Sequence, residues 1–239
     1  MRVEPYAVDS YMHALKRGSR GLPIVGDEAD QWRNLRLLFY KNDHFVDENW
    51  ERDTAELGMF GRPPEWPEQE PIVKILCYTL MPNHFHLLLK EIVEGGMSLF
   101  MKKIGDSMTG VFNEKYKSKG SIFQGSYKSK TVGEDTYLRY LAAYIMVKNV
   151  MELYPKGGLA GAVKNFEEAW EWALSYPFSS LGDYVGNRVV HPSPVIDKEI
   201  LGELFATPRE FKAHAKEVIL AGKWLEEKKV SRFAALALE

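Results

Sequence analysis

The sequence has a single cysteine, Cys77, among its 239 residues. One thiol cannot form a disulfide framework within the chain, and it cannot supply a zinc site of several cysteines. No stretch approaches the ~18 uninterrupted apolar residues of a membrane span, and the first residues lack the apolar segment of a secretory signal. We therefore expect a cytoplasmic protein with no membrane partner.

A strong net charge is also missing, because 31 Lys and Arg residues face 33 Asp and Glu residues. The overall charge does not indicate a nucleic-acid partner, but its distribution is uneven. Residues 43–70 carry nine acids and two arginines, which we interpret as solvated surface. Residues 101–130 carry seven lysines and two acids, interleaved with aromatic residues. This mixture suits contacts with single-stranded nucleic acid, and a solvated helix face is the alternative. The lysines are Lys102, Lys103, Lys115, Lys117, Lys119, Lys128 and Lys130.

The composition is that of a globular protein with a core, since 45% of the residues are hydrophobic and 27% are charged. Runs of β-prone residues predict strands, and apolar positions spaced by three or four residues predict helices. The expected strands lie within 7–16, 71–80, 84–90 and 121–132, and the expected helices begin near 27 and cover 97–116 and 134–151. This order predicts an α+β fold with an antiparallel-rich sheet covered by helices.

Two histidines stand out in the expected strand that begins at residue 84. His84 and His86 are two residues apart, so in a strand both imidazoles point to one face while Phe85 points to the other. With oxygen partners, such a pair can bind Mg²⁺ or Mn²⁺, and the ion can polarise a phosphoryl oxygen. Two structural histidines are the alternative. The other four histidines, His13 among them, have no comparable partner in the sequence.

A tyrosine can attack phosphorus and hold a covalent intermediate, which conserves the energy of the broken phosphodiester for rejoining. Tyr137, Tyr140 and Tyr144 cluster on the helix expected over 134–151. Their periodicity alone also fits aromatic packing residues.

The string TLMPNHFHLLLK, from Thr79 to Lys90, resembles the signature of the single-tyrosine HUH transposases, particularly the REP-associated tyrosine transposases and their insertion-sequence relatives. The resemblance continues through residues 111–145 and through YPFSSLGDY at 176–184. With KRGSRG at 16–21, it covers most of residues 7–185. It implies a ferredoxin-like, HUH-type domain over 1–185 with an acidic insertion at about 42–70, followed by a helical C-terminal extension over 186–239.

The resemblance also implies an activity. His84 and His86 take the metal-ligand positions and Tyr144 takes the nucleophile position, whereas Tyr137 and Tyr140 fall outside the motif. The family implies that the tyrosine attacks single-stranded, hairpin-forming DNA, leaving a 5′-phosphotyrosine and a free 3′-hydroxyl. It implies Mg²⁺ or Mn²⁺ and no nucleotide cofactor. The oligomeric state can be a monomer or a homodimer.

One position departs from the family. Relatives usually carry Asn or Gln four residues after the tyrosine, where this chain has Lys148 followed by Asn149. A protonated lysine has no lone pair for a metal, and on a regular α-helix Asn149 points ~140° away from Tyr144. We therefore expect Lys148 to be a catalytic cation that favours the phenolate, with a surface lysine as the alternative. The third ligand stays open, with Asn113, Glu114 and Gln124 as further candidates.

The leading hypothesis is a transposase-like enzyme that cuts and joins single-stranded DNA. Two alternatives remain. The first is a nucleic-acid-binding protein on the same scaffold without strand transfer. The second is a metal-dependent nuclease that uses water, keeps His84 and His86, and does not depend on Tyr144.

Overall fold

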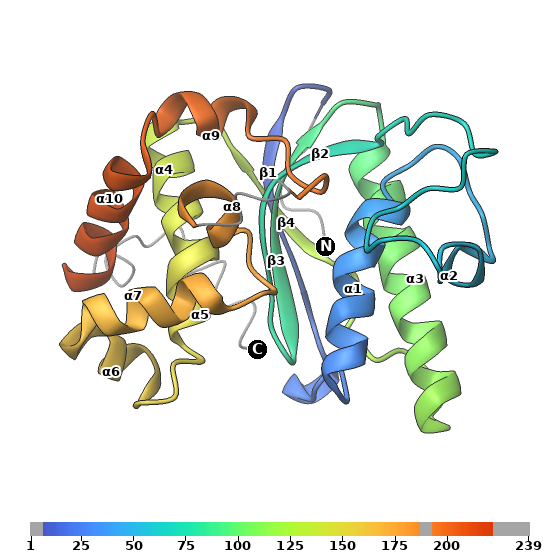
Figure 1. The fold of residues 1–239 in the computed structure, drawn as a ribbon, viewed down its shortest axis with the longest axis horizontal. Coiled ribbons are helices and arrows are strands. Elements are labelled where there is room, and N and C mark those ends of the chain that lie inside the picture. Colours follow the sequence, from blue (N-terminus) through green and yellow to red (C-terminus); the bar gives the residue numbers. More distant parts are fainter. Residues whose placement is uncertain (1–6, 187–192, 222–239) are drawn as a thin grey trace.

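The structure is a computed structural model that describes residues 7–186 and 193–221. Positions 187–192 and 222–239 of the expected C-terminal extension lie outside the described residues. Figure 1 shows a central sheet between two layers of helices. No helix in the described ranges is long and apolar enough to cross a membrane. The expected α+β class, with an antiparallel sheet covered by helices, is confirmed.

The sheet has four strands in the order β2-β3-β1-β4, and each neighbouring pair runs antiparallel. The strands are β1 (Tyr11–Arg17), β2 (Val73–Leu80), β3 (His84–Glu91) and β4 (Lys128–Val132). The expected Met-Pro-Asn turn joins β2 to β3, where the Met81 N–H donates to the His84 carbonyl at 2.8 Å. The register places Leu15 opposite His86 and Arg17 opposite His84, so the β1 residues with these side chains share the histidine face.

One helical layer covers the sheet face that carries Phe85, Leu87 and Leu89. It contains α1 (Glu28–Tyr40), α2 (Trp50–Asp53) and α3 (Gly96–Tyr116). Helix α1 begins where the sequence predicts it, because the Asp27 side chain accepts the Asp30 backbone N–H at 2.9 Å.

The second layer covers the opposite face, where His86 and Leu88 point. Its first segment is one continuous helical run made of α4 (Asp135–Ala143), the π-helical turn η2 (Tyr144–Lys148) and α5 (Asn149–Met151). The other helices of this layer are α6 (Gly158–Lys164), α7 (Phe166–Ser175), α8 (Leu181–Val185), α9 (Glu199–Leu204) and α10 (Pro208–Leu220). A short 3-10 turn, η1 (Ser19–Gly21), follows β1. Leu201 and Phe211 join the same apolar cluster as Leu141, so the described part of the C-terminal extension packs on α4.

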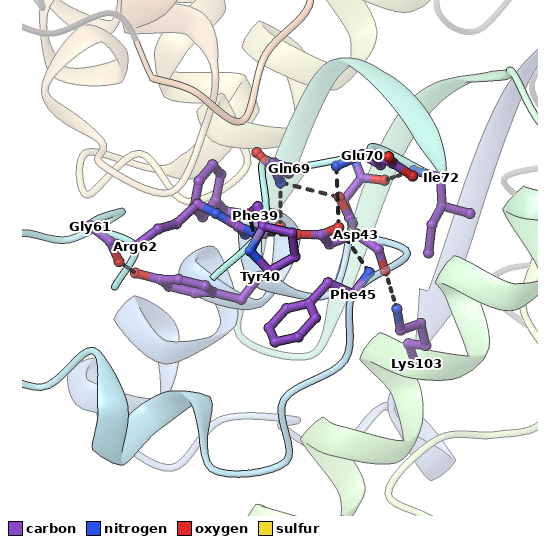
Figure 2. A network of polar contacts seen from close by, with 12 residues as sticks. Phe39, Tyr40, Asp43, Phe45, Gly61, Arg62, Gln69, Glu70, Ile72 and Lys103 are labelled. Carbon is purple, nitrogen blue, oxygen red and sulfur yellow. Dashed lines mark hydrogen bonds and ion pairs between the residues drawn. The ribbon is translucent and has the colours of Figure 1, made fainter. Parts of the chain in front are cut away.

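The acidic segment 42–70, which the resemblance marks as an insertion, is anchored to the sheet. Asn42 is 7% exposed, and its side-chain oxygen accepts the N–H groups of Ile72 and Val73, both at 3.0 Å. Asp43 is buried and accepts from Arg62 at 2.7 Å (Figure 2). Asn42 thus fastens the segment to the start of β2.

Candidate active site

The two histidines of β3 face the layer that contains the tyrosine helix. The ring centroids of His84 and His86 are 5.1 Å apart, and that of His86 is 5.7 Å from Tyr144. Burial, together with the charges of Arg17 and Lys148, lowers the pKa of His84 to about 4. Burial also holds the pKa of His86 well below its usual value. Both imidazoles are therefore neutral at pH 7 and each has one nitrogen lone pair to offer.

Asn83 fixes the orientation of His84. The Asn83 Nδ2 donates to the Gly21 carbonyl at 3.2 Å, so its Oδ1 is the atom that lies 2.7 Å from the His84 Nδ1. An amide oxygen only accepts, which means that His84 carries its proton on Nδ1. The lone pair of His84 is then on Nε2. The asparagine of the Met-Pro-Asn-His string thus has a defined physical role.

The sequence did not reveal His13 as part of this cluster. His13 lies on β1, is 1% exposed, and places its Nε2 2.8 Å from the Nδ1 of His86. Its ring centroid is also 6.1 Å from that of Tyr144. Our expectation that His13 has no comparable partner is wrong, because strand pairing joins residues 73 positions apart in the sequence. In the sequence, the alternation of His13 with Leu15 and Arg17 along the expected strand indicates only that these three side chains share one face of the sheet.

Tyr144 is the tyrosine whose ring meets the histidines. It is 5% exposed, while Tyr140 and Tyr137 stack behind it along α4 with centroid separations of 6.1 and 6.2 Å. Burial raises the pKa of the Tyr144 phenol, and the charge of Glu152 raises it further. At pH 7 the phenol is protonated, so attack on phosphorus requires loss of that proton.

The tyrosine helix is distorted where the expected helix was regular. Residues Tyr144–Lys148 form a π-helical turn, and the Asn149 N–H donates to the Tyr144 carbonyl five residues back. Two side-chain hydroxyls bind carbonyls of this turn. The Thr79 hydroxyl donates to the Ile145 carbonyl, and the Ser179 hydroxyl donates to the Met146 carbonyl at 3.3 Å. A π turn inserts one extra residue into a helix and is frequent at functional sites.

The π turn changes the position of Asn149. In an α-helix the residue four positions on lies above the first, whereas the five-residue hydrogen bond places Asn149 above Tyr144. Asn149 is 1% exposed, and neither its Nδ2 nor its Oδ1 has a hydrogen-bond partner among the described residues. Asn149 would point ~140° away from Tyr144 only on a regular α-helix, and the π turn is a distortion of that helix.

Lys148 lies beside Tyr144, but its surroundings differ from those expected. It is 9% exposed, its Nζ is 4.8 Å from the centroid of the Tyr144 ring, and it forms a 2.6 Å ion pair with Glu152. The expected lowering of the phenol pKa is not found, because burial and Glu152 act in the opposite direction. The ammonium sits over the ring face and is shared with a carboxylate.

The seven lysines of 101–130 divide between the two layers. Lys102 and Lys115 pair with Asp106 and Asp27 on the α1–α3 side, and Lys103 donates to the Asp43 carbonyl there. Lys117 and Lys119 are exposed just beyond α3. Lys128 and Lys130 lie opposite Leu15 and His13 on β4, which puts them on the histidine face. Of the seven lysines, only Lys128 and Lys130 therefore lie on the sheet face that the helix of Tyr144 covers.

The other proposed metal ligands are placed elsewhere. Asn113 lies near the end of α3 and donates to the Gly120 carbonyl at 2.8 Å, and Glu114 is exposed on the same helix. Gln124 is exposed, and its backbone N–H donates to the Arg17 carbonyl at 2.9 Å. Within the described ranges, no group of three or more His, Cys, Asp or Glu side chains is arranged to hold a metal ion. The Asn149 amide, whose buried oxygen has no hydrogen-bond partner among the described residues, is a candidate of another type.

Comparison with known proteins bears on the same residues. The family model of IS200-like transposases matches residues 68–148. A solved REP-associated tyrosine transposase bound to a REP hairpin is 13% identical, covers 84% of this chain and 96% of its own, and has a TM-score of 0.44. A Deinococcus radiodurans R1 protein named as a transposase is 15% identical over 59% of this chain and 93% of its own, with a TM-score of 0.30. No curated protein matches the chain.

The family match is the finding that bears on identity, because it contains β2, β3, α3, β4, α4 and the π turn. His84, His86 and Tyr144 all fall inside it, as the resemblance seen in the sequence implied. The segment from residue 68 to residue 148 is therefore similar to the IS200-like transposases, in agreement with the resemblance seen in the sequence.

Proposed function

We propose that the chain is a transposase-like enzyme that cleaves and rejoins single-stranded DNA, with Tyr144 as its nucleophile. The observation that carries the proposal is the 5.7 Å separation of the Tyr144 and His86 rings inside the matched segment. The arrangement puts the phenol beside the His86 imidazole, with the His84 ring 5.1 Å from that of His86, between the sheet and a helix.

In the reaction, the Tyr144 oxygen forms a bond to the scissile phosphorus while the bond from phosphorus to the 3′ oxygen breaks. The phenol loses its proton, and the departing 3′ oxygen takes one up from solvent. The products are a 5′-phosphotyrosine and a free 3′-hydroxyl. Rejoining is the reverse, because the phosphotyrosine retains the energy of the broken phosphodiester.

The residues present fit a divalent ion. His84 offers Nε2, His86 offers one ring nitrogen, and the buried Asn149 amide is an oxygen donor that lacks another use in the described structure. A bound Mg²⁺ or Mn²⁺ would polarise a phosphoryl oxygen and so favour attack. Asn149 thus fills the ligand role that the family gives to the residue four positions after the tyrosine. The π turn adds one residue to the helix and so brings the fifth residue to that position.

Lys148, Lys128 and Lys130 supply positive charge on the same face. We assign Lys148 to the reacting phosphate, since it lies over the nucleophile, and the two β4 lysines to neighbouring phosphates of the strand. Lys102, Lys103 and Lys115 have partners in the other layer and contribute less.

The test is formation of protein-linked DNA. Protein is incubated with labelled single-stranded hairpin DNA and Mn²⁺ and then analysed by denaturing electrophoresis. Tyr144→Phe removes only the phenolic oxygen, so DNA binding should persist while the covalent product disappears. Tyr140→Phe is the matched control on the same helix and should keep it. An adduct of normal yield from Tyr144→Phe would refute the assignment.

A DNA-binding protein without strand transfer is the second candidate. It is favoured by the burial of Tyr144, whose 5% exposure requires the site to open before a phosphate reaches the phenol. Hairpin binding by the wild-type chain with no adduct under any Mn²⁺ concentration would identify this function. A water-using nuclease would instead release free ends and would be unchanged in Tyr144→Phe.

A further inference from the structure

His13 is buried on the histidine face and is not accounted for by the chemistry above. It lies on β1, opposite Leu88 on one side and Lys130 on the other. Its ring is stacked on that of His86, with an interplanar angle of 25° and centroids 5.0 Å apart. The 2.8 Å contact from its Nε2 to the His86 Nδ1 joins two side chains that are both removed from water. A polar pair this deeply buried persists only when it is hydrogen-bonded.

A hydrogen bond between two neutral imidazoles has only two forms. In the first, His86 carries its proton on Nδ1 and donates to His13, so the lone pair of His86 is on Nε2. In the second, His13 donates, His86 accepts at Nδ1, and its Nε2 carries a proton. Only the first form lets His86 offer Nε2 to a metal ion. The location of one proton therefore decides whether His86 can be a ligand through that nitrogen.

The neighbouring histidine shows which form matches the site. His84 donates from Nδ1 to Asn83, which leaves Nε2 as its lone-pair atom. If His86 donates from Nδ1 to His13, both histidines are held at the same ring nitrogen and both present Nε2. Metal-binding histidines are generally oriented in this way by an acceptor on the second nitrogen.

We propose that His13 is a positioning residue that accepts a hydrogen bond from the His86 Nδ1–H and thereby fixes the ring and tautomer in which His86 Nε2 is available to a divalent ion. The inference deepens the proposed function, because it assigns the group that orients one of its two histidine ligands. His13 itself contacts no substrate in this assignment. Its role is the one that Asn83 has for His84.

The direct test is the proton position in the metal-free protein. Long-range ¹H–¹⁵N spectra of histidine-labelled protein distinguish a ring protonated at Nδ1 from one protonated at Nε2. We expect the Nδ1–H form for both His84 and His86. In His13→Met, which fills the space and offers only a weak sulfur acceptor, His86 should shift toward the Nε2–H form while His84 stays unchanged as the internal reference. His13→Gln, which restores an acceptor, should return His86 to the Nδ1–H form.

The second readout is Mn²⁺ binding measured by calorimetry without DNA. Loss of a group that orients a ligand typically weakens metal affinity roughly 10- to 100-fold, so His13→Met should fall in that range and His13→Gln should recover most of the loss. The wild-type spectrum needs no variant, so the test survives a variant that fails to fold. An Nε2–H form for His86 in the wild type overturns the proposal, as does a His13→Met protein with unchanged tautomer and Mn²⁺ affinity.

The outcomes separate this inference from the proposed function. Normal DNA cleavage with a His86 tautomer that is independent of His13 rejects the positioning role alone. A His13-dependent tautomer and Mn²⁺ affinity in a protein that never forms a DNA adduct keeps the positioning role and rejects strand transfer.

Discussion

The two helical layers differ in how their buried amides are satisfied. On the α1–α3 side, Asn42 accepts two backbone N–H groups through Oδ1 and donates from Nδ2 to the Val73 carbonyl at 2.8 Å. On the tyrosine side, the Asn149 amide is at least as deeply buried and has no hydrogen-bond partner within the described residues. Asn42 thus links α1 to the start of β2, whereas the donor and the acceptor of the Asn149 amide are not used within the described residues.

The difference shows where the molecule gives up stability. An unsatisfied buried polar group costs about 1–3 kcal/mol, and a folded protein tolerates this mainly where another molecule supplies the missing partner. The tyrosine side holds Asn149, the His13–His86 pair and Lys148 within one turn of helix and two strands. On the other face of β3, Phe85, Leu87 and Leu89 are apolar, and the buried Glu91 at the end of the strand is satisfied by the N–H groups of Gly95 and Met97. Substitutions on the two faces should therefore affect different properties.

The largest difference between the two faces is expected for substitutions at neighbouring residues of β3, which should affect either cleavage or stability. His84→Ala and His86→Ala should each abolish Mn²⁺-dependent cleavage, because one imidazole cannot both hold an ion and orient the phosphate. Hairpin binding should fall much less. The assay is single-turnover cleavage in Mn²⁺, and cleavage at the wild-type rate by either variant would show that the pair is structural.

Leu87→Ala is the control for the histidine substitutions, because it lies between His86 and Leu88 but faces the other layer. Removal of this fully buried side chain should lower the free energy of unfolding by about 2–5 kcal/mol. Cleavage per folded molecule should stay normal. Loss of cleavage without loss of stability would mean that the two faces are not independent.

The face of the histidine pair could be predicted because alternation along a strand is a local property. His13 could not, since its neighbour is determined by the pairing of β1 with β3. The helix over 134–151 was predictable from its periodicity, but the π turn was not, because its carbonyls are satisfied by Thr79 and Ser179 from distant segments. The burial of Lys148 was missed for the same reason. Local pattern thus predicted the elements, and tertiary packing determined the site.

The two asparagines offer the next test. Asn149→Leu replaces an unsatisfied amide by an apolar group of similar size, so the free energy of unfolding should stay the same or rise. Mn²⁺ affinity should fall by at least the roughly 10- to 100-fold that is typical of weaker outer-shell changes. Calorimetry and thermal unfolding measure the two quantities on the same samples.

Asn42→Leu is the opposite case. It leaves the Ile72 and Val73 N–H groups without their acceptor, which should cost about 1–3 kcal/mol or more of stability, and it should not change Mn²⁺ affinity. If Asn149→Leu also lost stability and kept its Mn²⁺ affinity, Asn149 would be a packing residue and the third ligand would lie elsewhere.

A smaller effect should distinguish the lysines of the two layers. The Lys128→Gln, Lys130→Gln double variant removes charge from the histidine face, so the log-log dependence of hairpin affinity on salt should flatten by roughly 0.7 for each phosphate that is no longer neutralised. The Lys102→Gln, Lys103→Gln double variant removes the same charge from the other layer and should leave the slope unchanged. Filter binding across a salt series measures both. Equal slopes in the two double variants would place the DNA path away from β4.

The smallest effect concerns the charges beside Tyr144, the proposed nucleophile. Burial and Glu152 hold the pKa of the Tyr144 phenol above its usual value, so the phenolate is scarce at pH 7 and the cleavage rate should rise with pH. Lys148→Met removes the cation 4.8 Å from the ring and leaves the carboxylate of Glu152, which should slow cleavage at pH 7 by roughly fivefold, about 1 kcal/mol, with partial recovery in alkali. Glu152→Gln removes the charge that raises the phenol pKa and releases Lys148 from its ion pair, so it should speed cleavage at the same pH. Single-turnover rates across a pH series compare the two variants with the parent. Opposite shifts support a catalytic Lys148, and two variants that match the parent in rate and pH profile would show that Lys148 only packs against Tyr144.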